Sequence, residues 1–157
     1  MIEILQRETR QPLSRVEAES LAGASLTGAN LHAADLEGAD LRGANLRSAH
    51  LGAANLRGAD LSGADLEGVN FREACLTGAC LAGARLLGAD FSGADLSGAD
   101  LCGADLTDAW LRDQYTGPFK GGPGPANLTG ARYDAATRWP RRENPETCGA
   151  VRMPRER

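Results

Sequence analysis

The sequence repeats itself every five residues over most of its length. Leucine, or phenylalanine at 71 and 91, recurs at every fifth position from Leu21 to Leu111, which makes nineteen consecutive pentads. Alanine usually stands two positions earlier, Asp or Asn one position earlier, and Gly two positions later. The fold must therefore give residues that are five positions apart the same kind of environment.

Neither a regular helix nor a straight strand satisfies this period. In an α-helix, with about 100° per residue, successive leucines would be rotated by about 140° and would spread around the circumference. In a straight strand, side chains alternate with period two, so successive leucines would face opposite sides. Ala and Leu share one side only if each pentad is a short extended segment that turns a corner at Gly, which tolerates unusual backbone angles. The pattern therefore predicts an all-β solenoid with an interior of Ala and Leu.

The exceptions to the repeat indicate how many pentads complete one turn. Several corner positions hold a residue other than Gly, and four of these six are separated by multiples of 20. Phe71 and Phe91 are also 20 residues apart. Because irregular side chains favour matching neighbours in adjacent coils, these spacings favour four pentads per turn. The corner residues other than Gly are Ala33, Ser48, Ala53, Glu73, Asp108 and Asp113.

The run "GANLHAADLEGADLRGANL" resembles the pentapeptide-repeat proteins, whose motif is A(D/N)Lxx. The resemblance implies a right-handed, four-sided (quadrilateral) β-helix, with about five to six coils in a chain of this length. It agrees with the four pentads per turn that the exceptions suggest. A solenoid of this kind leaves unpaired backbone at both ends, so we expect a cap at each of them.

We expect a single domain over 1–157, beginning with an N-terminal cap at 1–18. Apolar residues lie on both sides of the polar stretch "RETRQP", which favours a β-hairpin as the cap. A short helix over 14–23 is the alternative. The β-helix itself is expected at 19–113.

The step from Leu111 to Leu128 is 17 residues, which is one pentad plus twelve residues. We interpret 114–125 as a loop inserted at one corner, and 126–135 as the last repeats. Residues 136–157 would form an irregular C-terminal cap and tail. We expect Trp139 to cover the open core, and residues 152–157 to be disordered.

The polar residues of the repeat are interpreted as structural. Asp and Asn interchange before leucine, which suits side chains that bond the nearby backbone and not a catalytic carboxylate. Arg85 takes this position once, and we expect it to pair with Asp65 and Asp105, one coil away on either side. His32 and His50 are expected to lie too far apart to share a metal, and Cys75 and Cys80 to be separated by a corner that prevents a disulfide.

No nucleophile–base constellation and no phosphate-binding motif is found; "GPFKGGPGP" lacks the Gly-Lys-Ser/Thr order. We therefore predict a protein that is not an enzyme, with no catalytic, cofactor-binding or metal-binding residues and no small-molecule substrate. The expected function is that of a structural scaffold or protein-interaction module. The alternative, which the family resemblance suggests, is a DNA mimic that binds DNA gyrase or another topoisomerase and protects it from inhibitors.

The partner-binding surface is expected at the C-terminal end, where most aromatic residues lie. Trp110 replaces Asp or Asn and should point outward, immediately before a loop that offers two further aromatic residues. Loops on rigid scaffolds often carry function. The predicted binding residues are Trp110, Tyr115, Phe119 and Lys120.

Charge and cysteine content suggest the setting of the protein. Residues 21–113 carry 13 acids and 6 bases, whereas 114–157 carry 4 acids and 8 bases. The four cysteines, which lack metal-ligand spacing, and the polar first 20 residues, which lack a signal peptide, favour a cytoplasmic location. The expected partner is another protein, with no direct nucleic-acid or membrane contact, and the chain is expected to be a monomer or an end-to-end homodimer.

Overall fold

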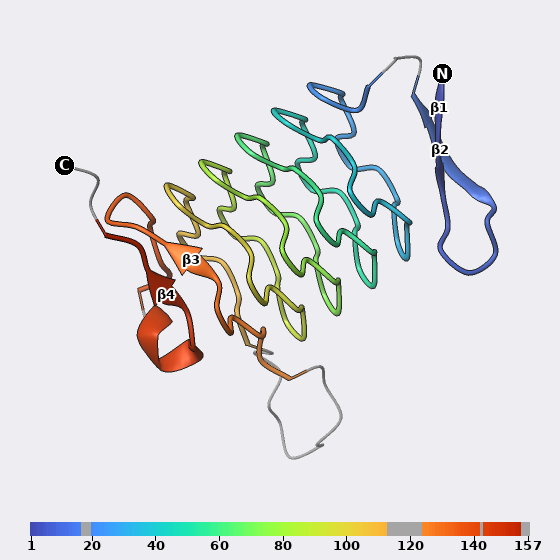
Figure 1. The fold of residues 1–157 in the computed structure, drawn as a ribbon. Coiled ribbons are helices and arrows are strands. Elements are labelled where there is room, and N and C mark those ends of the chain that lie inside the picture. Colours follow the sequence, from blue (N-terminus) through green and yellow to red (C-terminus); the bar gives the residue numbers. More distant parts are fainter. Residues whose placement is uncertain (17–19, 113–123, 142, 155–157) are drawn as a thin grey trace.

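The chain winds into a stack of coils in which positions 20 residues apart lie side by side (Figure 1). The computed structural model describes residues 1–16, 20–112, 124–141 and 143–154. From the bridge between Ser25 and Asn45 to the bridge between Asp90 and Trp110, every parallel bridge joins residues 20 apart. Four pentads therefore complete one coil, as the spacing of the exceptions predicts, and the chain forms a right-handed quadrilateral β-helix.

Each pentad contributes one short side and one tight turn. The N–H of Leu61 donates to the carbonyl of Cys80 in the next coil (2.7 Å), and the N–H of Ala64 donates back to the carbonyl of Leu61 (3.0 Å). Gly63, inside this turn, has φ of 64°. The same left-handed backbone is found at corners that lack glycine, with φ between 54° and 58°, so the turn itself imposes it. These corners are Ala33, Ser48, Ala53, Glu73 and Asp108.

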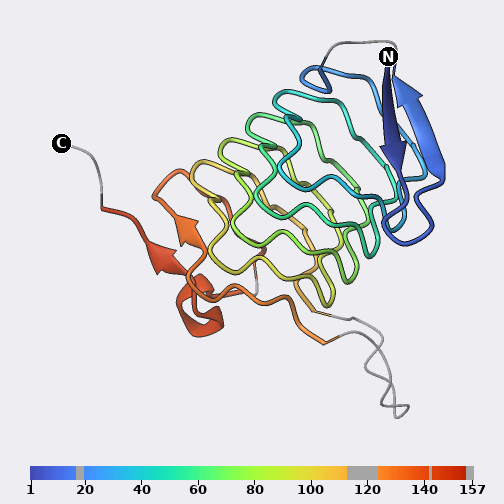
Figure 2. The ribbon, with the colours of Figure 1, turned by 45° about the vertical axis from the view of Figure 1, so that its right-hand side comes forward.

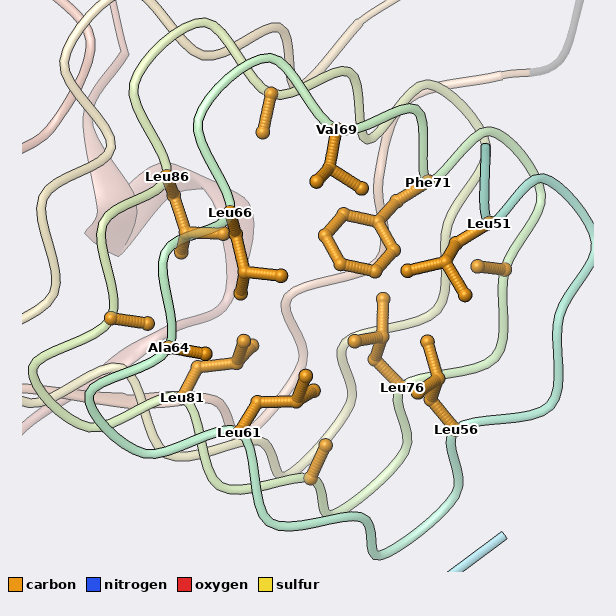
Figure 3. Close-up of a cluster of buried hydrophobic side chains, with 14 of the residues drawn as sticks. Leu51, Leu56, Leu61, Ala64, Leu66, Val69, Phe71, Leu76, Leu81 and Leu86 are labelled. Carbon is orange, nitrogen blue, oxygen red and sulfur yellow. The ribbon is translucent and has the colours of Figure 1, made fainter. Parts of the chain in front are cut away.

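The core is a column of Leu and Ala side chains that point into the coil from all four sides (Figure 3). Leu61 and Leu66 in the middle of the stack have no exposed surface. Phe71 and Phe91, which occupy one leucine column, stack with ring centroids 5.1 Å apart and an angle of 10° between the planes. The interior is therefore filled by side chains and forms a solid rod.

A β-hairpin covers the N-terminal end of the rod (Figure 2). Strand β1 (Ile2–Leu5) pairs antiparallel with β2 (Pro12–Val16). Ile4 is buried on the first coil, and the carbonyl of Leu5 accepts the N–H of Asp35 (2.8 Å). The hairpin prediction is confirmed. The alternative helix over 14–23 is wrong where the structure describes it, because residues 14–16 lie in β2.

Beyond residue 112 the coil register shifts. Asn127 bridges Asp95 and Arg132 bridges Asp100, so both steps are 32 residues instead of 20. The carbonyl of Gly124 accepts the N–H of Gly93 (2.7 Å), which fixes where the chain rejoins the stack. Strand β3 (Arg132–Tyr133) belongs to this last full coil.

The C-terminal cap consists of an aromatic pair and a returning segment. Trp139 packs against the core and meets Tyr133 edge-on, with ring centroids 5.5 Å apart. The chain then forms a short 3₁₀ helix, η1 (Pro145–Cys148), and strand β4 (Val151–Arg152), which pairs parallel with β3. The expectation of disorder from 152 onward is therefore wrong for Arg152 and Met153, since the Met153 N–H donates to the carbonyl of Tyr133 (2.6 Å). Residues 155–157 lie outside the described part.

Candidate partner-binding surface

The repeat fixes the direction of each polar side chain on the rod. In most regular pentads, Oδ1 of the Asp or Asn accepts the N–H of the residue two positions later; the bond from Ser62 to Asp60 is 3.0 Å long. This is the local backbone bond expected for these residues. It fastens each outward side chain beside its own corner, so the row before leucine forms a regular line of polar groups along the rod.

Trp110 interrupts this row at the C-terminal end. Its N–H and carbonyl make the regular bonds to the previous coil, to Ala89 and Phe91, at 2.8 Å each. The indole is therefore held on an ordered side of the rod, and 39% of the residue is exposed. The outward direction expected from the repeat is found. The other three predicted binding residues, Tyr115, Phe119 and Lys120, lie outside the described residues.

A depression of about 400 Å³ lies at the same end of the rod, where the coil resumes, and Leu111, the residue after Trp110, lines it. The guanidinium Nε of Arg112 pairs with Oε1 of Glu143 across it (3.2 Å). Glu143 and Cys148 come from the returning C-terminal segment, and the sequence reasoning missed both because that segment has no pentad pattern. The lining combines apolar and charged groups: Leu111, Arg112, Pro125, Ala126, Asn127, Leu128, Glu143, Thr147 and Cys148.

Cys102 lies in a second depression of about 700 Å³ on a neighbouring part of this end. Burial and the nearby Asp100 carboxylate raise the pKa of its thiol to about 11. Asp100 also pairs with Arg132, which lines the same depression. A thiol with such a pKa is protonated at neutral pH and is a poor nucleophile.

Asp134 holds the corner that joins this end to the cap. Its carboxylate accepts the N–H groups of Gly103 (3.0 Å), Ala136 (2.9 Å) and Thr137 (3.0 Å). The bond from the Gly103 N–H is the main reason that the pKa of Asp134 lies below its usual value. The Asp134 side chain therefore has a structural role: it bonds the corner at Gly103 to the first residues of the cap.

Most acidic side chains on the outer faces are paired with arginine. Arg47 contacts Asp65 and Glu67 at 3.4 and 2.5 Å. Arg85 contacts the same two acids at 3.5 and 3.3 Å. The predicted contact of Arg85 with Asp65 is confirmed, but the one with Asp105 is wrong. The guanidinium is directed instead to Glu67, which stands outward on the same coil as Asp65, and Asp105 pairs with Arg138 (3.2 Å).

The described residues contain no group of three or more His, Cys, Asp or Glu side chains arranged to hold a metal ion. All four cysteines, Cys75, Cys80, Cys102 and Cys148, are free thiols. No helix in the described part of the chain has the length and apolar character of a membrane span.

The comparison with known families defines the class of this rod. The family model for pentapeptide repeats matches eight copies, over residues 20–47, 49–86 and 76–108. The match covers more than half of the chain, which therefore belongs to the pentapeptide-repeat family. No curated protein matches the sequence.

Several solved structures of the same family resemble the chain. One is the pentapeptide-repeat protein Rfr23 from the cyanobacterium Cyanothece 51142, with 33% identity over 64% of each chain and a TM-score of 0.40. Another is HetL, a protein involved in heterocyst differentiation regulation in Nostoc sp. PCC 7120, with 36% identity over 73% of this chain and 52% of HetL, and a TM-score of 0.44. A third, alr5209 from Nostoc PCC 7120, has 29% identity, coverage of 82% and 84%, and a TM-score of 0.35. The chain spans less than two thirds of the length of the first two.

Proposed function

We propose that this protein is a non-catalytic interaction scaffold, and that its partner protein binds the C-terminal end around Trp110. One observation carries the proposal: a large aromatic side chain, 39% exposed, replaces Asp or Asn on an otherwise regular polar row. Tryptophan is enriched among residues that dominate binding energy. The depression lined by the next two residues, Leu111 and Arg112, adds apolar surface and the Arg112–Glu143 pair, a mixture typical of protein-binding sites.

The filled interior supports the absence of catalysis. Enzyme sites are concave and bring polar groups together in a sheltered space. Here the side chains inside the coil are Leu, Ala, Phe and Val, and most polar side chains point outward in rows. We infer a cytoplasmic protein, in keeping with four free thiols.

The proposal is tested by replacing Trp110 with Asn, which restores the ordinary residue of the repeat. Wild-type and variant chains are used to capture proteins from a lysate of the source organism. We expect a partner that the wild type retains and Trp110→Asn loses, with little change in melting temperature. Arg85→Asn is the matched control, since it makes the same kind of change in the equivalent row of another side. Equal capture by wild type and Trp110→Asn would disprove this binding surface.

The DNA-mimic alternative requires a broad negative surface that gyrase could accept in place of DNA. The arginines paired with Asp65, Glu67, Asp90, Asp100 and Asp105 interrupt such a surface. We therefore expect no inhibition of gyrase supercoiling and no relief of quinolone poisoning at micromolar concentration. Clear protection that weakens with added salt would favour the mimic over the scaffold.

A further inference from the structure

On the side of the rod that carries Phe71, the pentad of His50 lacks the backbone bond that the pentads directly before and after it make. In the coil before it, Oδ1 of Asn30 accepts the N–H of His32 (3.3 Å). In the coil after it, Oδ1 of Asn70 accepts the N–H of Arg72 (3.0 Å). Between them stands His50, whose side chain has no such oxygen.

The N–H of Gly52 is consequently left without an acceptor among the described residues. Gly52 is buried, although it stands at an outward position. Buried backbone N–H groups are nearly always paired with protein, water or a ligand. This N–H therefore marks a place where an external acceptor is expected.

Gly52 lies beside a depression in the outer surface. The position holds no side chain, and the imidazole of His32 lies over it: a Cβ built on Gly52 would be 3.1 Å from Nδ1 of His32. The open depression that these residues line has a volume of about 620 Å³. Its lining residues are Gly28, Asn30, His32, His50, Gly52 and Asn70.

The lining offers hydrogen-bond donors and no carboxylate. Because Oδ1 of Asn30 and of Asn70 each accept a backbone N–H, the Nδ2 groups are left to donate outward. The imidazoles of His32 and His50 can also donate a hydrogen bond from a ring N–H. The nearest acid along the row, Asp90, is paired with Arg72 at 3.2 Å.

We propose that this depression binds a small oxyanion of the phosphate type. The Gly52 N–H would donate to one oxygen, and the two imidazoles and the carboxamides would donate to the others. Concave sets of N–H donors are a known way for backbone to bind anions. A metal ion fits less well, because the amide N–H and Nδ2 groups donate and cannot act as ligands. This site is separate from the surface around Trp110 and does not depend on the proposed function.

The test is a titration of the full-length ¹⁵N-labelled chain, followed by amide NMR at fixed pH. The probes are inorganic phosphate, sulfate and glycerol 3-phosphate. We expect a saturable shift of the Gly52 amide with inorganic phosphate and with sulfate. An equal response to glycerol 3-phosphate would show that the site accepts the group on a small ligand, whereas a response to the free anions alone would assign it to the inorganic ion.

The decisive variant is His50→Asn, which gives Gly52 the acceptor that Asn30 and Asn70 provide in the coils before and after it. We expect it to lower phosphate affinity at least tenfold, with a melting temperature equal to or above that of the wild type. Cys80→Asn is the matched control, because it makes the same repair on another side and should leave binding unchanged. The proposal is overturned if the Gly52 amide does not respond, if His50→Asn binds as well as the wild type, or if Zn²⁺ shifts both histidines while phosphate has no effect.

Discussion

At the scale of single residues, each described corner of the regular coils places one residue in the left-handed region of the backbone map. Thirteen of these corners between 23 and 103 hold Gly, and five between 33 and 108 do not. L-residues other than Gly lose about 1 kcal/mol or more in this conformation. The corners without Gly are therefore places where the fold tolerates local strain.

Exchanging residues at two corners tests this cost directly. At Gly63 a Cβ would have no heavy atom within 4 Å, so Gly63→Ala changes only the backbone preference. We expect it to lower the free energy of unfolding by about 1 kcal/mol. Ala53→Gly should raise it by about 0.5–1 kcal/mol for the converse reason. Urea titrations of both variants measure the two changes, and the same sign for both would refute the argument.

The inward and outward positions of one pentad should respond very differently to truncation. Leu61 is fully buried, so Leu61→Ala removes apolar contacts and leaves a cavity in the middle of the rod. We expect a loss of about 3 kcal/mol. Ser62→Ala, one residue later on the outer face, should change stability by less than about 0.5 kcal/mol. Thermal melts of the two proteins provide the comparison.

At the scale of elements, the sequence predicted the coils and the N-terminal hairpin but not the returning C-terminal strand. The coils repeat, so each copy confirms the next, and the hairpin has two apolar segments around a polar turn. Strand β4 has neither signal. Tyr133 stands at the leucine position of the repeat, and its partner in β4 is Arg152, a charged residue that does not fit the repeat. The position of β4 depends on its pairing with β3, and no local sequence pattern predicts this pairing. Glu143 and Cys148 were not predicted as surface-lining residues because they too lie in a segment without the repeat.

The candidate surface was predictable only in part. Trp110 could be placed because the register of the repeat assigns every residue from 21 to 112 to an inward or outward position. The depression near Gly52 could not be predicted as a site. Its features are a missing bond at Gly52 and a ring of His32 placed above it, and both arise from the stacking of coils.

The attachment of the C-terminal cap should depend on pH through Asp134. Its lowered pKa means that folding favours the ionised form, so this contribution to stability is complete above about pH 5 and is lost as the pH falls through the lowered value. Asp134→Ala should cost about 2 kcal/mol at pH 7, because it leaves the N–H groups around the corner without their charged acceptor. The difference in stability between wild type and variant should shrink as the pH is lowered toward 3. A constant difference across this range would exclude the role of the charge.

At the scale of the whole molecule, the rod behaves as a stack in which each coil contacts mainly its neighbours. Removing residues 54–73 takes out one complete coil and joins two corners of the same column. We expect this shortened chain to fold, with a lower melting temperature because one interface between coils is lost. Removing residues 59–63 takes out a single side and turns every later residue onto the next face. Circular dichroism and melts should show a greater loss for this second deletion, because the pairs of residues that span it no longer match. Leu51, for example, would lie beside Leu76 instead of Phe71.

The shift from steps of 20 to steps of 32 has a consequence for how such a chain can change during evolution. After the shift, Asn127 lies beside Asp95 and Arg132 beside Asp100, so these two sides continue the columns of the coil before. Here the stack therefore accommodates twelve additional residues between two of its coils and keeps the columns on both sides of them. Mutations that add or remove pentads, in contrast, redirect every downstream face at once. New surface features can thus be acquired one corner at a time, while selection keeps the number of sides in each turn constant.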